Sequence, residues 1–361
     1  MKKTIIIIAS VMLSCAVLLA GSMYCLWYYD VLSETPISDE NAGLTLHFID
    51  VGQGDCTLVE SKGHYALIDA GEYTERQKVI SYLTKEGVRN LDYIFSTHPH
   101  SDHCGGISDV IRYFDTAVLI SPDAETDSSS WEYVLDAADE RGVEYETPEV
   151  SDTYKLGAAT ITVLSPATDA VYSDLNNYSI VTMIEYGDTS FLLTGDAEAM
   201  VERELLRKGF DLSADVLHCG HHGSSSSTCE DFLKAVNPAA AVISCGKNND
   251  YGHPHKEVKN LLNKYDIPLW RTDLNGNITA TSDGEKIYIA SGEECITVEK
   301  TTASETQANP LFIGNKNSKV YHKPDCASIF EMKEKNKVNF QSAKDAEKAG
   351  YSPCGSCIDN E

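Results

Sequence analysis

A dense cluster of metal-binding side chains stands in the segment Thr97-His-Pro-His-Ser-Asp-His103. Three imidazoles and one carboxylate, those of His98, His100, Asp102 and His103, fall within six residues. Both groups are common ligands of divalent metal ions such as zinc. His98 and His100 can face one ion, while Asp102 and His103 turn towards a second. The spacing therefore predicts a two-metal centre, with a solvated polar loop as the alternative.

The elements around this cluster predict further ligands at strand ends. Leu91–Ser96 reads as a buried strand that leads into the histidine loop. Asp196 ends another hydrophobic run, and His221 and His222 follow a third. Asp69 also ends a buried strand and can orient a ligating histidine from behind. An aspartate before a helix is often an N-cap, so each signal is weak alone, but together they predict one centre.

The spacing does not decide which of the paired histidines binds metal. We favour His221, which is nearer the strand end, with His222 facing the substrate or supporting a ligand. His253 and His255 are candidates to contact a scissile phosphate or to protonate a leaving group. The alternative is a loop at a helix start that contains incidental histidines.

Apolar runs and helical periodicity alternate from about residue 43 to residue 298. This mixture predicts an α/β sandwich rather than an all-α or all-β domain, and Asn275-Gly276 predicts the turn of a final hairpin. The predicted strands are Leu44–Asp50, Cys56–Glu60, His64–Asp69, Leu91–Ser96, Ala117–Ser121, Thr160–Ser165, Ile180–Tyr186, Ser190–Thr194, Asp215–Cys219, Ala240–Ser244 and Leu269–Thr272. The predicted helices are Thr74–Glu86, Trp131–Glu140, Glu198–Lys208, Cys229–Ala235 and Lys256–Lys264.

Over about residues 43–295 these motifs, in this order, resemble the metallo-β-lactamase superfamily of metal-dependent hydrolases. The likeness is greatest to its ComEC-type branch, the extracellular domain of the competence DNA-uptake protein, and phosphorylcholine esterases are similar in this core. The motifs that carry it are His98–His103, Asp69, His47–Asp55, Asn177-x-Ser179, Leu193–Asp196, His221–Ser224 and Tyr251–His255. The resemblance implies a four-layer αβ/βα sandwich with the metals in a cleft at one edge.

The resemblance has one departure that concerns the metals. Many members place a third histidine of the first metal between the histidine loop and the bridging aspartate. This chain has no histidine between His103 and His218, and offers Asn176, Asn177 and Ser179 instead, as the ComEC-type branch does. The first site is poorer in nitrogen, so zinc and manganese both stay open. We expect Asp55, Asn177 and Ser179 to support the site by hydrogen bonds.

The implied chemistry is hydrolysis of a phosphodiester. Two divalent ions lower the pKa of a bridging water, and the resulting hydroxide attacks phosphorus while Asp102 and Asp196 orient it. We expect DNA as the substrate and no nucleotide cofactor. The alternatives are an esterase for cell-envelope phosphodiesters and a non-catalytic surface binding module. The chain has 29 basic and 55 acidic residues; this argues against binding long nucleic acid by phosphate neutralisation, although metal ions supply positive charge locally.

The amino terminus predicts a membrane anchor. Lys2 and Lys3 precede an apolar run of about 24 residues, Thr4–Trp27, which is long enough to cross about 30 Å of hydrocarbon. With acids after the run, residues 1–29 predict a single-pass cell-membrane protein whose remainder is extracellular; a cleaved signal and a secreted protein are the alternative. Residues 30–42 read as a linker. The competence channel has many spans and this sequence has one hydrophobic run, so we do not expect the chain to be that channel.

The carboxyl-terminal residues 311–361 follow a polar linker, 299–310, and carry a second metal motif. His322-x3-Cys326 and Cys354-x2-Cys357 are separated by 27 intervening residues, which suits four ligands on one structural zinc. So short a segment has little core, and a metal stabilises it. It resembles the zinc-binding domain of Ada-type DNA repair proteins, whose methyl-accepting cysteine is replaced here by His322. The alternative is a redox-active pair of Cys354 and Cys357.

Overall fold

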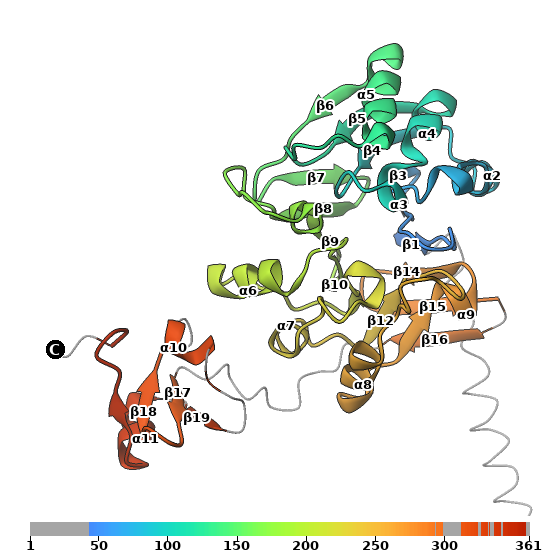
Figure 1. Ribbon diagram of the computed structural model, residues 1–361. Helices are drawn as coiled ribbons and strands as arrows, with labels where there is room; N and C mark the ends of the chain where they lie inside the picture. Colours follow the sequence, from blue (N-terminus) through green and yellow to red (C-terminus); the bar gives the residue numbers. More distant parts are fainter. Residues whose placement is uncertain are drawn as a thin grey trace, which may run out of the picture. The chain divides into compact units, whose positions relative to one another are not determined.

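The computed structural model describes residues 43–292, 294–298, 312–323, 326–330, 332, 336–340 and 342–358. The chain divides into two compact units, one up to Lys300 and one from Thr301 (Figure 1). The predicted anchor and both predicted linkers lie outside the described residues. Within the described ranges, every helix is too short or too polar to pass through a bilayer.

The larger unit is built on two β-sheets. The nine-stranded sheet has the order β16-β15-β14-β1-β2-β3-β4-β5-β6 and the seven-stranded sheet has the order β13-β12-β11-β10-β9-β8-β7. The first consists of β1 (Leu44–Phe48), β2 (Thr57–Ser61), β3 (His64–Ile68), β4 (Asn90–Phe95), β5 (Asp115–Ile120), β6 (Glu144–Glu146), β14 (Ile278–Ser282), β15 (Ile287–Ser291) and β16 (Glu294–Val298). The second consists of β7 (Thr153–Leu156), β8 (Ala159–Ser165), β9 (Val181–Tyr186), β10 (Thr189–Leu193), β11 (Val216–His218), β12 (Ala240–Ile243) and β13 (Leu269–Arg271).

Three hydrophobic clusters define the layers. The central cluster joins the inner faces of the two sheets, for example Phe48 of β1 with Phe191 of β10. A second lies between the nine-stranded sheet and α2 (Arg76–Lys85), α4 (Ile107–Tyr113) and α5 (Ser129–Arg141). A third lies between the seven-stranded sheet and α6 (Ala199–Lys208), α7 (Glu230–Val236) and α8 (Lys256–Lys264). Each sheet thus buries both faces, which accounts for its long apolar runs, and the unit has the α-β-β-α layers expected from the sequence (Figure 1).

Parallel pairing brings the chemically interesting loops to one edge. Strand β3 pairs in parallel with β4, and β10, β11 and β12 are parallel neighbours in the other sheet. Polar segments follow the carboxyl ends of these strands, among them the short helices α3 (Ser101–Cys104) and η3 (His221–Gly223). Because parallel strands end at the same edge of their sheet, the loops after β3, β4, β10, β11 and β12 can share one site.

The predicted hairpin at Asn275-Gly276 is wrong. Residues Thr272–Asn275 form the helical turn α9, and the Gly276 amide donates to the carbonyl of Thr272. The Asn275 side chain accepts from the backbone of Arg271 instead of initiating a hairpin. This segment carries the chain from β13 in one sheet to β14 in the other, and the β14–β15 hairpin turns over the following residues, around Gly284.

The smaller unit has a four-stranded sheet of order β19-β17-β18-β20. Its described elements are β17 (Phe312–Asn315), β18 (Val320–His322), α10 (Ala327–Phe330), β19 (Lys337–Phe340), α11 (Ala343–Lys348) and β20 (Ser352–Pro353). Tyr321, Phe340, Ala346 and Tyr351 form one apolar cluster, and Cys326, Ile329, Met332 and Cys354 form another. Two clusters of this size are a small core, in agreement with the need for another source of stability.

Candidate metal centre

His103 is oriented by a carboxylate behind it. Its Nδ1 lies 2.8 Å from Oδ2 of Asp69, and both side chains are fully buried. Asp69 also accepts from the backbone amide and the hydroxyl of Thr97, at 2.8 and 2.6 Å. The proton of the ring therefore sits on Nδ1, which leaves Nε2 free as a ligand atom. That Nε2 has no hydrogen-bond partner in the structure, and the loop after β3 thus sets the ring for a metal.

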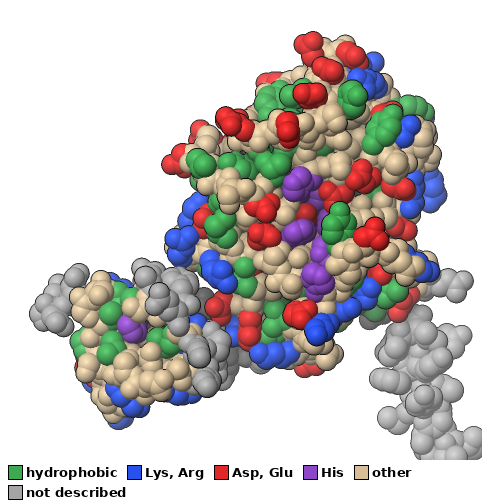
Figure 2. All heavy atoms as spheres, viewed as in Figure 1, with side chains coloured by type: hydrophobic (Ala, Val, Ile, Leu, Met, Phe, Trp, Pro, Cys, Tyr) green, Lys and Arg blue, Asp and Glu red, His purple; other side chains and the backbone are tan. Residues whose placement is uncertain are grey.

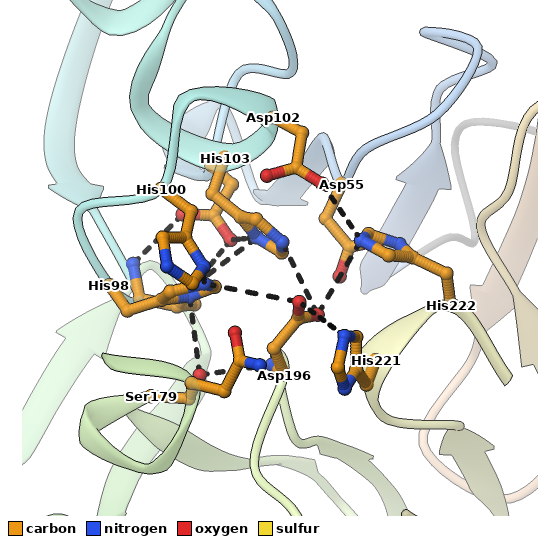
Figure 3. Close-up of polar contacts among 12 residues, drawn as sticks. Asp55, His98, His100, Asp102, His103, Ser179, Asp196, His221 and His222 are labelled. Carbon is orange, nitrogen blue, oxygen red and sulfur yellow. Dashed lines mark hydrogen bonds and ion pairs between the residues drawn. The ribbon is translucent and has the colours of Figure 1, made fainter. Parts of the chain in front are cut away.

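His222 is held in the same manner from the opposite sheet. Its Nδ1 lies 3.1 Å from the carbonyl oxygen of Ser244 and 3.2 Å from Oδ1 of Asp55. Its unpartnered Nε2 lies 3.3 Å from Oδ2 of Asp102. Asp102, His103 and His222 offer ligand atoms that all lie within 4.8 Å of one another. The β4, β11 and β12 ends therefore form one candidate cation site (Figure 3).

Asp196 stands between this group and a second one (Figure 3). Its Oδ1 lies 3.2 Å from Nε2 of His103 and 3.6 Å from Nε2 of His222. Its Oδ2 lies 3.9 Å from Nε2 of His98. His98, His103 and Asp196 form a further group of potential ligand atoms within 4.8 Å. Asp196 thus has the position that a carboxylate shared by two ions requires.

His98 and His100 face one another at the second group. Nε2 of His98 lies 2.9 Å from Nδ1 of His100, and His98 is fully buried while His100 is partly exposed. Around Nδ1 of His98 lie two hydroxyl oxygens at 3.2 Å, those of Thr97 and Ser179. Because Ser179 also accepts from the Asp196 amide at 2.9 Å, it ties the histidine loop to the β10 end. The Ser179 hydroxyl therefore lies where it can position both His98 and Asp196.

The electrostatics of the cluster call for positive charge at its centre. Asp55, Asp69 and Asp196 are buried, and Asp102 is partly buried. Burial alone disfavours a charged ring, yet Asp196, Asp69 and Asp102 raise the pKa of His103 well above its ordinary value. Burial likewise opposes ionisation of Asp196, but His222 and His103 hold its pKa well below the usual range. Buried carboxylates require compensating positive charge, and bound divalent ions would supply it.

The structure differs from the sequence-based preference for His221. His222, not His221, lies with Asp102 and His103, and its side chain is 2% exposed against 21% for His221. Both residues have left-handed backbone, with φ of 52° and 54°. This pair of left-handed residues between Gly220 and Gly223 turns the second ring inwards. His221 lies beside the centre instead: its Nε2 is 3.7 Å from Asp196 Oδ2 and its Nδ1 is 3.1 Å from Ser226 Oγ.

His253 and His255 separate into two roles. His253 lines a pocket over the centre, and burial together with His222 and His221 lowers its pKa to about 4. An uncharged ring suits a hydrogen bond to substrate better than protonation of a leaving group at neutral pH. His255 accepts from the Ser225 amide through Nδ1 and lies 3.2 Å from the Tyr251 carbonyl through Nε2. Both ring nitrogens of His255 are thus engaged by backbone groups, an arrangement that favours the structural alternative over the catalytic role considered from the sequence.

The pocket has a volume of about 290 Å³ and opens on one face of the larger unit. Figure 2 shows histidine side chains gathered on that face among acidic ones. Its walls are formed by Gln53, His100, Ser101, Asp102, Asn176, Asp196, His221, His222, Tyr251 and His253. Asn176 is buried and its Oδ1 has no hydrogen-bond partner. An oxygen ligand atom therefore stands in the pocket wall, in the segment that the sequence analysis singled out in place of a third histidine.

Several supporting residues were not singled out from the sequence. Glu198 lies 3.7 Å from His221 Nδ1 and exchanges hydrogen bonds with Asn177. His218 is buried behind Asp55, with Nδ1 3.8 Å from that carboxylate and Nε2 2.9 Å from the hydroxyl of Ser244. A histidine inside the otherwise apolar β11 was the available signal for His218. Asn177 thus supports the site through Glu198 rather than by touching the histidines.

The smaller unit contains a separate candidate site. His322, Cys326, Cys354 and Cys357 offer ligand atoms that all lie within 4.8 Å of one another. Nδ1 of His322 lies 3.3 Å from Sγ of Cys326. One imidazole and three thiolates with this spacing form the donor set of a structural zinc site.

The fold and the site define a metal-dependent hydrolase of the α/β sandwich type. Residues 49–247 match the family described as the metallo-beta-lactamase superfamily, and residues 298–360 match the metal binding domain of Ada. The chain therefore belongs to the metallo-β-lactamase superfamily and carries an Ada-like metal-binding domain at its carboxyl end.

Curated relatives narrow this placement. The chain is 35% identical over 275 residues to ComE operon protein 3 of Bacillus subtilis, a match that covers 71% of this chain and 34% of the relative. It is 32% identical to competence protein ComA of Neisseria gonorrhoeae, covering 63% and 30%. It is 28% identical to ribonuclease Z of Pseudomonas putida, covering 54% and 59%. The chain thus spans about a third of the length of ComE operon protein 3 and of competence protein ComA.

Proposed function

We propose that this protein is an extracellular, membrane-anchored hydrolase that uses two divalent metal ions to cleave phosphodiesters, with DNA as the substrate. One observation carries the proposal. The buried carboxylate of Asp196 lies within 4 Å of ring nitrogens from the β4 loop and the β11 loop, including two that have no hydrogen-bond partner. Such a cage of imidazole and carboxylate groups suits two neighbouring cations, zinc or manganese.

The donor atoms fit two ions that share Asp196. Asp102, His103 and His222 would hold one, and His98 and His100 would hold the other. Bound ions would supply a deprotonated water near neutral pH and would offset charge on phosphoryl oxygens. Residues of the chain hold the protons of His103 and His222 on Nδ1, so that Nε2 of each ring faces the centre.

The role of the protein's own residues is to orient the ligating rings, the attacking water and the substrate. Asp69 keeps a proton on Nδ1 of His103, while Asp55 and the Ser244 carbonyl keep one on Nδ1 of His222. Asp102 orients the attacking water, and the uncharged ring of His253 hydrogen-bonds a phosphate oxygen in the pocket. His221, held by Ser226 and facing Asp196, contacts the substrate from the neighbouring wall.

DNA is favoured over other diesters by the relatives rather than by surface charge. One of the relatives is named a competence protein, and another is named a ribonuclease. The formal charge of −26 weakens binding to a long duplex, but local cations permit a short segment to enter. The carboxyl-terminal domain adds support, because it resembles the metal-binding domain of Ada-type DNA repair proteins.

The test uses the full chain with single-stranded DNA, double-stranded DNA and bis-p-nitrophenyl phosphate, each with manganese, zinc and magnesium. We expect DNA cleavage with one of these metals and none after chelation. Asp102→Asn should abolish turnover without loss of folding, as judged by circular dichroism. Hydrolysis of the small diester without DNA cleavage would favour an envelope phosphodiester, and unchanged turnover in Asp102→Asn would refute the assignment.

Anchoring and the small domain have their own tests. The protein should sediment with membranes and be digested by protease added outside intact cells; recovery from the medium would indicate secretion.

The Ada-like domain should hold one structural zinc. Replacing both Cys326 and Cys354 by Ser should lower the zinc content of the full chain by one ion per molecule, and an unchanged zinc content would exclude this site.

A further inference from the structure

One wall of the pocket ends in an exposed aromatic ring. Tyr251 is 67% exposed, although it lines the same pocket as Asp102 and Asp196. Its ring stacks on the ring of His253, with centroids 5.6 Å apart and an angle of 21° between planes. One face of the tyrosine is thus supported by His253. The other face of this aromatic ring, beside a polar pocket, can therefore pack against a planar group of a ligand.

The loop that carries this ring is held in place by hydrogen bonds. Asn249 accepts from the His253 amide at 2.9 Å and donates to the carbonyls of Gly246 and His253. The Tyr251 carbonyl is bonded to the ring of His255, which also accepts from Ser225. Because the backbone is fixed on both sides of Tyr251, little conformational entropy remains to be lost when a ligand stacks on the ring.

The composition of the pocket suggests what stacks there. No lysine or arginine is among the residues that line it, so its walls offer a phosphate chain no ammonium or guanidinium group. Proteins that bind single-stranded nucleic acid obtain sequence-tolerant affinity by stacking bases on aromatic side chains. A base paired in a duplex has both faces covered by its neighbours, whereas an unpaired base is free to stack.

We infer that Tyr251, backed by His253, is a platform for one unpaired nucleobase next to the scissile phosphate. This inference rests on the proposed function, since it names the substrate class of the same site as single-stranded nucleic acid. Tyr251 is then a specificity-determining residue that binds the base and takes no part in the chemistry.

The test separates binding from turnover. In the full chain carrying Asp102→Asn, a short single strand that contains 2-aminopurine should lose fluorescence on binding, because stacking quenches this base. Tyr251→Ala should remove the quenching and raise Kd by roughly tenfold, the order found for base-stacking aromatics. Tyr251→Phe should keep both, because the ring and not the hydroxyl makes the contact. Tyr133→Ala is the matched control, since Tyr133 is 57% exposed on α5 and is absent from the pocket lining.

Kinetics supply the second readout. With the active chain, an abasic nucleotide beside the cleaved phosphate should raise KM while kcat changes little, and Tyr251→Ala should be insensitive to that change. Equal Kd and equal quenching in Tyr251→Ala and its parent would overturn the inference, as would equally strong, Tyr251-dependent binding of a blunt duplex. Absence of all hydrolysis with intact, Tyr251-dependent quenching would instead refute the proposed function alone.

Discussion

Oδ1 of Asp55 lies 3.2 Å from Nδ1 of His222. The carboxylate comes from the loop between β1 and β2, and the histidine comes from the end of β11 in the other sheet. This contact links the two halves of the sandwich at the candidate metal centre, and together with the Ser244 carbonyl it favours a proton on Nδ1 of the ring. The amino-terminal loop therefore contributes to the metal centre through Asp55, whose carboxylate also lies within 4.8 Å of potential ligand atoms of Asp196 and His222.

Replacing Asp55 by Asn should weaken metal binding without unfolding the protein. The neutral amide no longer favours a proton on Nδ1 of His222, and losses of roughly 10- to 100-fold in metal affinity are usual for such partners. Manganese and zinc titrations by calorimetry measure this. Asp50→Asn is the control, because Asp50 is in the same loop but pairs with Lys78 at the surface. Equal affinity in Asp55→Asn and wild type would contradict the role.

The two neighbouring histidines should behave differently when each is replaced by Ala. His222→Ala should lose about one bound metal ion, since its Nε2 faces Asp102 and Asp196. His221→Ala should keep its metal and lose activity, because its ring faces the pocket wall. Metal content by elemental analysis after gel filtration distinguishes them. Loss of metal in His221→Ala with retention in His222→Ala would reverse the assignment.

Gly54 should tolerate no side chain. A Cβ there would lie 2.3 Å from the backbone oxygen of Asp102, at a φ of 141°. Gly54→Ala must push this loop away from the centre, so we expect loss of metal affinity as well as of stability. Gly63→Ala is the matched control: it also has positive φ, 80°, but open space around it. It should cost roughly 1–2 kcal/mol of unfolding free energy and leave metal affinity unchanged.

Glu230 should stabilise the protein in a pH-dependent way. Hydrogen bonds from Lys264 and Tyr265 lower the pKa of Glu230 to about 2. An unfolded glutamate has a pKa of roughly 4.3, so these contacts stabilise the folded state above that pH, and the contribution is lost as the pH falls towards 2. Because the side chain is 32% exposed, solvent screening limits the effect to about 1 kcal/mol or less.

Urea unfolding followed by tryptophan fluorescence checks this expectation with Glu230→Gln. The gap in unfolding free energy between wild type and variant should be largest near pH 7 and should shrink as the pH falls from 5 towards 3. Glu257→Gln is the control, because Glu257 is 59% exposed and only 4.0 Å from its lysine. A gap that stays constant with pH would show that the pairs do not act through the carboxylate charge.

Strand ends were the most predictable part of the molecule. The segment Leu91–Ser96 marks β4, in which Leu91, Ile94 and Phe95 are buried, because a strand inside a covered sheet is rich in apolar residues. The polar residues that follow these runs, among them Asp69 and Asp196, then have to meet at one edge. Long amphipathic helices such as α6 were predicted to within a residue for the same reason of periodicity.

What escaped prediction depends on backbone conformation and on distant contacts. The order of His221 and His222 around the centre follows from two successive left-handed residues, which no periodicity reveals. Asn275-Gly276 has the composition of a hairpin turn. In the structure, however, the Asn275 side chain accepts a hydrogen bond from the Arg271 amide, and the chain passes there from one sheet to the other. His255 is distinguished from His253 by its hydrogen bonds to the backbone of Ser225 and Tyr251, which form only in the folded protein.

The most direct test of the two-metal account is anomalous diffraction from crystals of the full chain grown with manganese. We expect two peaks that both contact Asp196, one beside Asp102, His103 and His222 and the other beside His98 and His100. Density at only one position would reduce the centre to a single ion. Crystals with Asp196 distant from the His98–His103 loop, or without any peak beside it, would contradict the account.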